Sequence, residues 1–314
     1  MNKLGKRKIP FLFVLDYKLK QPHIIPLGLI DSNKILYSIN GITNVSDFKK
    51  PAKQLNFNFN PVDFKRYEKA FNLVQQHILH GNSFLLNLTM PSEVECNYSL
   101  KEIYAASQAK YKLWFKDHFA VYSPEIFIQT KGRKISSFPM KGTIDANFPD
   151  AKKTLLSSNK EVAEHHTIVD LIRNDLSMVA KNVRVARFQY IDHIKTNKCE
   201  LLQMSSEISG ELPADYNEHL GDIMFTLLPA GSISGAPKAK TLEIIREAEK
   251  YERGYFTGIF GIFDGENIDS GVMIRFIEKT STGLIYKSGG GITSQSDCEQ
   301  EYQELINKIY VPVA

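Results

Sequence analysis

Apolar side chains recur every three or four positions over residues 62–80, which predicts an amphipathic helix. Five residues share its apolar face: Phe64, Tyr67, Phe71, Val74 and Ile78. Gly81 follows the last of them and can end the helix. Further helices are expected after a capping box formed by Ser99 and Glu102, and over about 159–179, 237–252 and 297–309.

Between the helices lie short apolar runs bounded by turn residues, which predict strands. They cover 11–15, 84–90, much of 111–138 and 184–209, 256–263, 268–277 and 284–288, with a hairpin turn at DGEN (264–267). The strands come in groups and do not alternate regularly with helices. The pattern therefore predicts an α+β fold of large, mostly antiparallel sheets with surrounding helices. No linker is evident, so we expect a single domain over residues 1–314.

Composition narrows the functional classes. The chain is 43% hydrophobic and 24% charged, with a net charge of +4. No basic stripe with interleaved aromatic residues suggests nucleic-acid binding. The apolar run 11–15 stops at Asp16 without a signal-peptide cleavage site, and no run is long enough to span a membrane. The three scattered cysteines (Cys96, Cys199 and Cys298) favour a reducing, cytoplasmic location.

Two predicted helices each present a pair of carboxylates. Glu161 and Glu164 are three residues apart, as are Glu301 and Glu304, so each pair shares a helix face. Four such carboxylates could hold Mg²⁺, which prefers oxygen ligands. A structural interpretation stays open as well, because Ser158–Glu161 reads as a capping box and Glu304–Lys308 as a surface ion pair. Between Asp170 and Asp175, Arg173 is interpreted as part of a structural ion pair.

Two glycine-rich segments are candidates for ligand contact. PAGSISGAPKAK (229–240) lacks the Gly-Lys-Ser/Thr of a Walker loop but places Ser232 and Ser234 before a helix N-terminus, a position that favours an anion. SGGGITSQSD (288–297) places three glycines between a strand and a helix, which fits either close approach to a ligand or a flexible turn.

Two basic residues stand in apolar surroundings. In SSFPMKGTID (136–145), Lys141 follows a strand and precedes a Gly-Thr turn, so it is either a solvated charge or a lysine delivered to a pocket. Arg275 lies in the predicted strand GVMIRFIE, where strict alternation gives it the same face as Met273 and Ile277. A charge on such a face needs a partner, and a substrate carboxylate could be bound bidentately by arginine.

Together and in this order, seven segments resemble the chorismate-utilising enzymes, a family that includes anthranilate synthase component I, isochorismate synthase, salicylate synthase and aminodeoxychorismate synthase component I. The segments are SPEIF (123–127), PMKGT (139–143), EVAEHHTIVDLIRNDL (161–176), PAGSISGAPKAKTLEII (229–245), ERGYFTGIFG (252–261), SGVMIR (270–275) and GGGITSQSDCEQEYQE (289–304). The motif-bearing part covers about 62–310, preceded by an N-terminal region shorter than in larger relatives. That shortness predicts that the tryptophan pocket of those relatives is absent.

The resemblance implies chorismate as substrate and Mg²⁺ as cofactor. Glu164 and Glu304 would be direct metal ligands, supported by Glu161 and Glu301. Arg275 and the three glycines would hold the enolpyruvyl carboxylate. The full set of substrate-binding positions that it implies is Gly142, Thr143, Ser234, Phe256, Arg275, Gly289, Gly290, Gly291 and Lys308.

The same resemblance gives Lys141 a role. Anthranilate and isochorismate synthases have alanine at this position, whereas aminodeoxychorismate synthases typically have lysine. The implied mechanism is covalent: Lys141 attacks C2 of chorismate, Glu125 protonates the departing 4-hydroxyl, and ammonia adds at C4 to give 4-amino-4-deoxychorismate, the folate-branch precursor of p-aminobenzoate. A lysine nucleophile must be neutral, so we expect the pocket to lower its pKa by desolvation.

Three positions depart from the family pattern. Leu85 replaces a polar residue that is the lysine general base in isochorismate synthases, Gln203 stands for a histidine, and Phe256 stands for a tyrosine. The chain also lacks a glutaminase nucleophile turn, so ammonia is expected from a separate glutamine amidotransferase subunit or from free ammonium. Anthranilate synthase component I and a non-catalytic chorismate-binding homologue are the alternatives.

Overall fold

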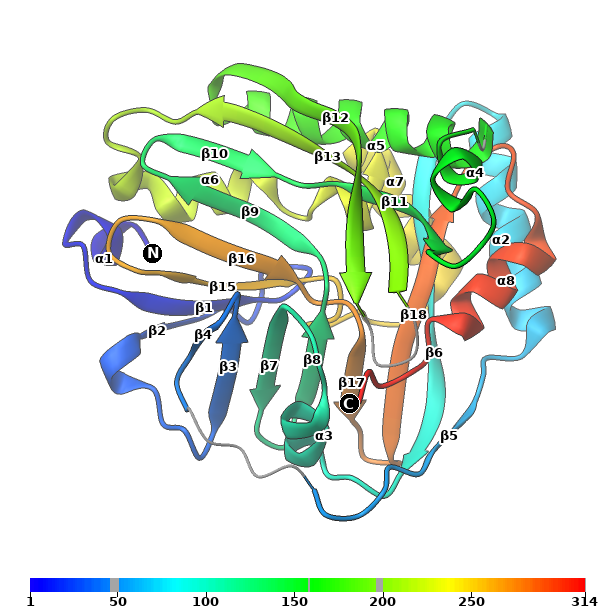
Figure 1. Cartoon of the computed structure of the whole chain (residues 1–314), viewed down its shortest axis with the longest axis horizontal. Coiled ribbons are helices and arrows are strands. Elements are labelled where there is room, and N and C mark those ends of the chain that lie inside the picture. The colour runs from blue at the N-terminus through cyan, green and yellow to red at the C-terminus, as the bar shows by residue number, and fades with distance from the viewer. Residues whose placement is uncertain (46–50, 158, 196–199, 314) are drawn as a thin grey trace.

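The computed structural model describes residues 1–45, 51–157, 159–195 and 200–313, whose strands form two nine-stranded sheets (Figure 1). In the first sheet the order is β11 (Met140–Asp145), β13 (Glu200–Glu211), β10 (Lys134–Ser137), β9 (Ile126–Lys131), β16 (Ile268–Val272), β15 (Ile259–Phe263), β1 (Phe11–Leu15) and β2 (His23–Pro26), and β12 (Lys181–Lys195) also pairs with β13. The pairs are antiparallel throughout the sheet.

The second sheet has the order β14 (Gly235–Ala236), β6 (Leu85–Cys96), β18 (Leu284–Ile292), β17 (Phe276–Lys279), β8 (Phe119–Ser123), β7 (Tyr111–Phe115), β3 (Ile35–Ile39) and β4 (Ile42–Thr43), with β5 (Phe57–Asn60) on β6. It is antiparallel too, which confirms the predicted α+β fold with large antiparallel sheets.

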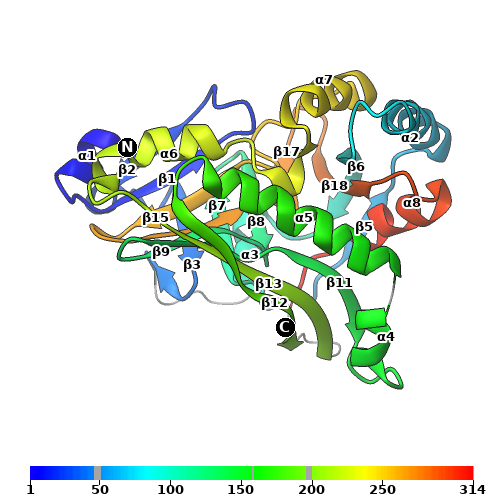
Figure 2. The ribbon, with the colours of Figure 1, turned by 90° about the horizontal axis from the view of Figure 1, so that it is seen from above.

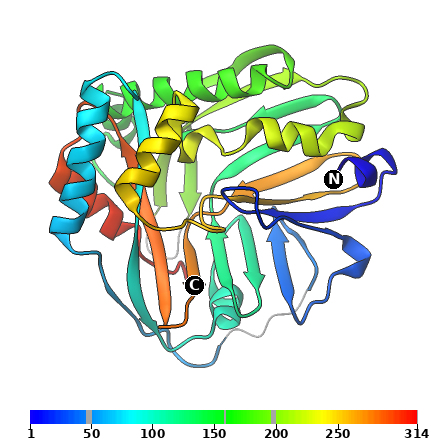
Figure 3. The same cartoon turned by 180° about the vertical axis from the view of Figure 1, so that it is seen from behind.

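Helices cover both sheets. They are α1 (Asn2–Lys6), α2 (Phe64–Leu79), α3 (Leu100–Ala106), α4 (Ala151–Ser157), α5 (Asn159–Ser177), α6 (Leu220–Leu227), α7 (Lys238–Glu249) and α8 (Cys298–Asn307), with 3₁₀ turns η1 (Leu27–Leu29), η2 (Tyr216–His219) and η3 (Gly231–Ile233). Helix α5 lies across the first sheet at β12 and β13, whereas α2, α7 and α8 gather beside β6 and β18 (Figures 2 and 3). Helix α5 also contacts β11 of the first sheet, and α8 contacts β18 of the second.

Three large apolar clusters, besides a small one of Ala151, Leu155, Leu202 and Met204, hold the described layers together. One lies between the second sheet and α2, α3, α7 and α8, and another between the first sheet and α5 and α6. The third lies between the two sheets and is rich in aromatic residues, such as Tyr111, Phe119, Phe260 and Phe276. Burial of these side chains is the main favourable contribution to folding.

The local predictions were mostly confirmed. Helix α2 begins after Asp63, whose side chain accepts from Arg66 N, and the Ser99–Glu102 capping box is present. The segment 11–15 is β1, and all five of its residues are buried. Cys96 and Cys298 are free thiols, and Cys199 lies outside the described residues, as does Ser158 of the expected capping box. No helix in the described ranges is long and apolar enough to cross a membrane.

Two strand predictions were wrong. The expected strand 268–277 is two strands, β16 and β17, which belong to different sheets. The chain changes direction between them, where Arg275 has a φ of +53°. The strand expected over 284–288 is longer than predicted: it continues through the three glycines 289–291, which pair with Asn87, Leu88 and Thr89 of β6, so the flexible-turn alternative does not hold.

A buried ion pair connects the segment before α7 to the second sheet. Arg253 and Glu249 are 2.6 Å apart, and each side chain is 1% exposed. Arg253 also donates to the backbone oxygens of Ile233 and Asn87, at 2.8 and 2.7 Å. This arginine therefore fixes the position of η3 relative to β6.

We expect Arg253→Met to lower the free energy of unfolding by about 3–5 kcal/mol, because Glu249 would remain buried without its counter-ion. Urea unfolding measures the change. Arg246→Met, on the exposed face of α7, is the control, and its free energy of unfolding should stay within about 0.5 kcal/mol of wild type. Equal effects of the two substitutions would contradict the prediction.

Candidate functional site

Lys141 points into a site between the two sheets. It lies on β11, and its Nζ is 3.0 Å from Glu164 Oε2 of α5. A Cβ atom placed on Gly291 of β18 would be 3.3 Å from the same Nζ. The Lys141 side chain is 24% exposed and that of Glu164 is 9% exposed. Lys141 is therefore enclosed by three elements and is not a solvated surface charge.

The glycine strand forms one wall of this site. A Cβ on Gly290 would be 3.3 Å from Glu304 Oε1 and 3.4 Å from Glu301 Oε2. Lys308, at the end of α8, donates to the Gly289 oxygen at 2.8 Å and to Glu304 Oε1 at 2.5 Å. Glycine at these positions lets the backbone approach the charged groups closely, which explains why the strand carries no side chains here.

The four candidate metal ligands surround Lys141 and Gly290. A Cβ on Gly142, whose φ is +72°, would be 3.1 Å from Glu161 Oε2, so this residue also faces the site. Carboxylate oxygens are the donors that Mg²⁺ prefers, and the set fits that ion in kind. No three potential ligands converge closely enough to hold a metal within the described ranges. The Mg²⁺ site therefore stays a prediction.

Both glutamates predicted as direct metal ligands form ion pairs with lysines. Glu164 contacts Lys141, and Glu304 contacts Lys308 as the i,i+4 spacing predicted. Glu301, which is 2% exposed, accepts from the Ser296 hydroxyl at 2.8 Å. The two glutamates nearest the lysines thus balance cationic charge in this arrangement.

The expected fall in the Lys141 pKa does not occur in this arrangement. Burial lowers the pKa of Lys141, but the carboxylates of Glu164, Glu304 and Glu161 outweigh it, and the net effect is a raised pKa. Desolvation acts in the predicted direction, but the prediction considered only burial, and the negative charges around the amine act in the opposite direction. For Lys308 burial prevails, and its pKa is lowered although Glu304 opposes the change.

Glu125 lies in the connection between β8 and β9. Its Oε1 accepts a hydrogen bond from the Ser232 hydroxyl at 2.7 Å. Burial raises the pKa of Glu125, and the Ser232 hydrogen bond together with Lys141, Arg275 and Lys308 only partly offsets this. A carboxyl group with a raised pKa is suited to donate a proton.

Arg275 presents an unsatisfied donor. Its Nε is buried and has no hydrogen-bond partner in the part of the chain that the structure describes. The guanidinium lies 5.3 Å from the centre of the Tyr310 ring. A buried donor without a partner is costly, and a carboxylate would satisfy it. Because Arg275 has a positive φ, it is not part of a regular strand, and the predicted alternation with Met273 and Ile277 does not apply.

Two residues predicted to contact the substrate are packed in the interior. The Ser234 hydroxyl is fully buried and donates to the Ala230 oxygen at 2.8 Å. Phe256 is 2% exposed and packs on Phe276, with ring centres 5.8 Å apart. The side chain of Thr143 lies outside the described residues. Within the segment 229–240, Ser232 has the direct contact with Glu125, and substrate contact by Ser234 stays a prediction.

Two residues of the site, Leu85 and Ser232, have contacts that the sequence did not indicate. Leu85 is 3% exposed, and its Cδ1 would be 3.1 Å from a Cβ on Gly291, on the same glycine that faces Lys141. The apolar residue noted as a departure is thus part of the site wall. Ser232 was considered only as a helix N-terminal residue, and no local pattern indicated its contact with Glu125. Gln203 lies opposite Thr143 in the β11–β13 pairing.

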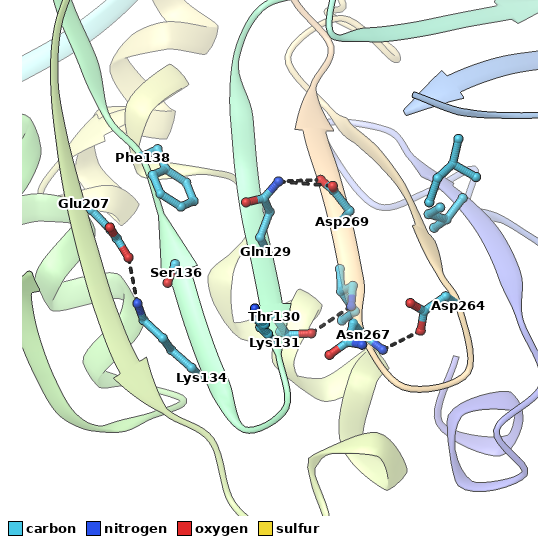
Figure 4. Close-up of a pocket in the computed structure, with 13 residues that line it drawn as sticks. Gln129, Thr130, Lys131, Lys134, Ser136, Phe138, Glu207, Asp264, Asn267 and Asp269 are labelled. Carbon is cyan, nitrogen blue, oxygen red and sulfur yellow. Dashed lines mark hydrogen bonds and ion pairs between the residues drawn. The ribbon is translucent and has the colours of Figure 1, made fainter. Parts of the chain in front are cut away.

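A cleft of about 410 Å³ lies elsewhere on the first sheet (Figure 4). Its lining includes Gln129 and Asp269, which are hydrogen-bonded at 3.1 Å, and Lys134 and Glu207, which are 2.7 Å apart. Polar groups that satisfy one another leave little for a ligand, and none of the predicted site residues lies in this cleft. We therefore place the candidate site at Lys141.

Comparison with known proteins decides the family. The family described as chorismate binding enzyme matches residues 32–314. The chain belongs to this family.

Individual relatives show how far the similarity extends. An "uncharacterized PabA-like protein" of Haemophilus influenzae is 49% identical over 99% of this chain and 95% of its own length. Aminodeoxychorismate synthase component 1 of Bacillus subtilis is 29% identical over 78% of this chain, and anthranilate synthase component 1 of Acetivibrio thermocellus is 33% identical over 74%. The match covers 54% and 49% of these two longer proteins.

A solved structure supports the fold. The menaquinone-specific isochorismate synthase of Escherichia coli superposes with a TM-score of 0.74 over 98% of this chain and 78% of its own, at 16% sequence identity. The two sheets and their helices are thus the architecture of a chorismate-utilising enzyme.

Proposed function

We propose that this member of the chorismate-binding family is an aminodeoxychorismate synthase component I, which converts chorismate and ammonia to 4-amino-4-deoxychorismate. The observation that carries the proposal is the position of Lys141, enclosed by β11, α5 and β18 at the centre of the site. Leu85 beside Gly291 supports it, because a leucine cannot serve as the base that would activate water.

In the proposed reaction Lys141 is the nucleophile and Glu125 the proton donor. The Lys141 amine forms a bond to C2 of the ring, the ring double bonds shift, and the C4–oxygen bond breaks. Glu125 gives its proton to the departing hydroxyl, which leaves as water. Ammonia then adds at C4, the lysine–C2 bond breaks, and the proton lost from the added nitrogen restores Glu125.

The remaining residues bind and orient the substrate. Arg275, whose buried Nε has no hydrogen-bond partner among the described residues, would pair with the enolpyruvyl carboxylate, together with the backbone of Gly289–Gly291. Glu164 and Glu304, supported by Glu161 and Glu301, would hold Mg²⁺, and the ion would supply positive charge for the ring carboxylate. If those glutamates bound Mg²⁺, their negative charges would no longer raise the pKa of Lys141, and its burial would act to lower that pKa.

Anthranilate synthase component I is the second candidate, because a relative of that name is the more identical of the two, at 33% against 29%. The two enzymes use the same substrate and differ in the carbon atom that receives nitrogen. The enclosed Lys141 favours the aminodeoxychorismate reaction, since a covalent bond at C2 blocks addition of ammonia there.

Product analysis with chorismate, Mg²⁺ and ammonium at high pH tests the proposal. We expect 4-amino-4-deoxychorismate as the main product, because free ammonia can add at C4. With glutamine in place of ammonium, we expect product only after a glutamine amidotransferase subunit is added. Release of anthranilate with pyruvate would decide for the second candidate, and chorismate binding without any product would indicate a non-catalytic homologue.

A further inference from the structure

The segment Ala230–Ser234 links the proposed proton donor to helix α5. Ser232, in η3, donates its hydroxyl hydrogen to Glu125 at 2.7 Å. The preceding residue, Gly231, lies against the Asp175 carboxylate, and its backbone N–H helps to lower the pKa of that carboxyl group. Two successive residues of one short turn therefore contact Glu125 and Asp175.

The contact between Gly231 and Asp175 is close. A Cβ atom on Gly231 would be 2.7 Å from Asp175 Oδ2 and 2.9 Å from Leu171 Cγ. No side chain fits there without movement of α5 or of the turn. The Asp175 carboxylate thus lies directly against the backbone that carries Ser232.

Asp175 has a structural partner of its own. The structural ion pair expected of Arg173 is formed with Asp170, at 2.7 Å, and so does not involve Asp175. Asp175 is 7% exposed and lies 3.1 Å from Lys238 Nζ, which also donates to the Leu227 oxygen at 3.1 Å. Burial raises the pKa of Asp175, and Lys238 and the Gly231 N–H partly offset this. The proposed reaction gives this costly buried carboxylate no other role.

A small cavity also joins the two carboxyl groups. It has a volume of about 20 Å³, enough for one water molecule, and is lined by both Glu125 and Asp175 as well as by Gly231 and Ser232. The turn, the cavity and both acids thus form one connected unit.

We propose that Asp175 is a positioning residue for Glu125: with Lys238 as its counter-ion, it holds Gly231 so that the Ser232 hydroxyl meets Glu125. The inference rests on the proposed function, in which Glu125 gives its proton to the departing hydroxyl. Arg253, bonded to the Ile233 oxygen, holds the other end of the same turn.

The kinetic test compares four variants with wild type. Ser232→Ala and Asp175→Ala should each lower kcat about tenfold and leave KM for chorismate within about twofold, because the proton donor is misplaced while substrate contacts remain. The double variant should resemble Ser232→Ala alone, since both changes act through one contact. Asp170→Ala, which breaks the exposed ion pair on the same helix, is the control and should match wild type.

The pH profile gives a second readout. The Ser232 hydrogen bond stabilises the Glu125 carboxylate, so its loss raises the Glu125 pKa and moves the alkaline limb of kcat to higher pH. The charged groups that face Glu125 from the other elements are Lys141, Arg275 and Lys308, and none of them is altered. Asp175→Asn keeps an acceptor for Gly231 and should retain more activity than Asp175→Ala. Full additivity in the double variant, or an equal loss in Asp175→Asn, would overturn the inference.

A measurement without substrate separates this inference from the proposed function. The Glu125 pKa can be followed by carbon-13 NMR of the labelled carboxyl group, assigned with Glu125→Gln. We expect it to rise in both Ser232→Ala and Asp175→Ala and to stay unchanged in Asp170→Ala. A rise in Ser232→Ala without one in Asp175→Ala would refute the positioning role. If the rise occurs but wild type makes no aminodeoxychorismate, the proposed function alone fails.

Discussion

Lys141→Ala should lower kcat for aminodeoxychorismate formation by about a thousandfold or more, while chorismate still binds. The amine is the proposed nucleophile, and loss of a group that acts only on the reaction path lowers kcat far more than it raises KM. Ammonia or water could then attack C2 directly, so traces of other products are expected. Steady-state kinetics and product analysis with chorismate, Mg²⁺ and ammonium measure the effect.

The matched control is Lys134→Ala. Lys134 also lies on the first sheet and pairs with a glutamate, Glu207, at 2.7 Å, but it is 53% exposed and outside the site. A surface substitution of this kind changes stability by about 0.5 kcal/mol or less and should leave turnover alone. If Lys141→Ala behaves like this control, the covalent mechanism is wrong.

Glu164→Gln and Glu304→Gln should each lower turnover about 100-fold or more at limiting Mg²⁺. Each substitution removes a charge and keeps the shape of the side chain, and stabilisation by a bound metal is worth several kcal/mol. The two residues come from α5 and α8: Glu164 contacts Lys141, and Glu304 lies beside Gly290. Removal of Mg²⁺ from wild type with a chelator should reproduce the loss.

The control and a direct binding measurement complete this test. Glu299→Gln changes an exposed glutamate in the first turn of α8 and should match wild type. Because Glu164 also pairs with Lys141, its substitution affects the lysine as well. Calorimetric titration with Mg²⁺ distinguishes the two effects, since only loss of a ligand weakens metal binding. Unchanged affinity in both variants would remove these glutamates from the metal site.

Much of the local structure followed from the sequence. The 3–4 residue spacing of apolar side chains placed α2 within two residues of its ends, and the pattern Ser-x-x-Glu placed the start of α3. These features depend on neighbours within one or two turns, so a linear pattern contains the information. The paired glutamates of α5 and α8 were placed on helix faces for the same reason.

Predictions that depended on strand pairing were less successful. The run 268–277 has the alternation of one strand, but it passes from one sheet to the other at Arg275, where φ becomes positive. A flexible turn was one of the two interpretations of the glycines 289–291, but β6 supplies hydrogen-bonding partners that keep them extended. Pairing partners far along the chain override local preference in β-structure.

The sequence by itself determined the elements, the family resemblance and the chemical types of the residues: a lysine between a strand and a Gly-Thr pair, carboxylates on two helix faces, and three glycines in a row. Only the tertiary structure decided what these residues meet. It set Lys141 against Glu164 and Gly291, gave Ser232 to Glu125, and paired Asp175 with Lys238. The physical reason is that such contacts depend on packing between elements far apart in sequence, and the field around a charge, which raises the pKa of Lys141, is the sum over groups that no local pattern brings together.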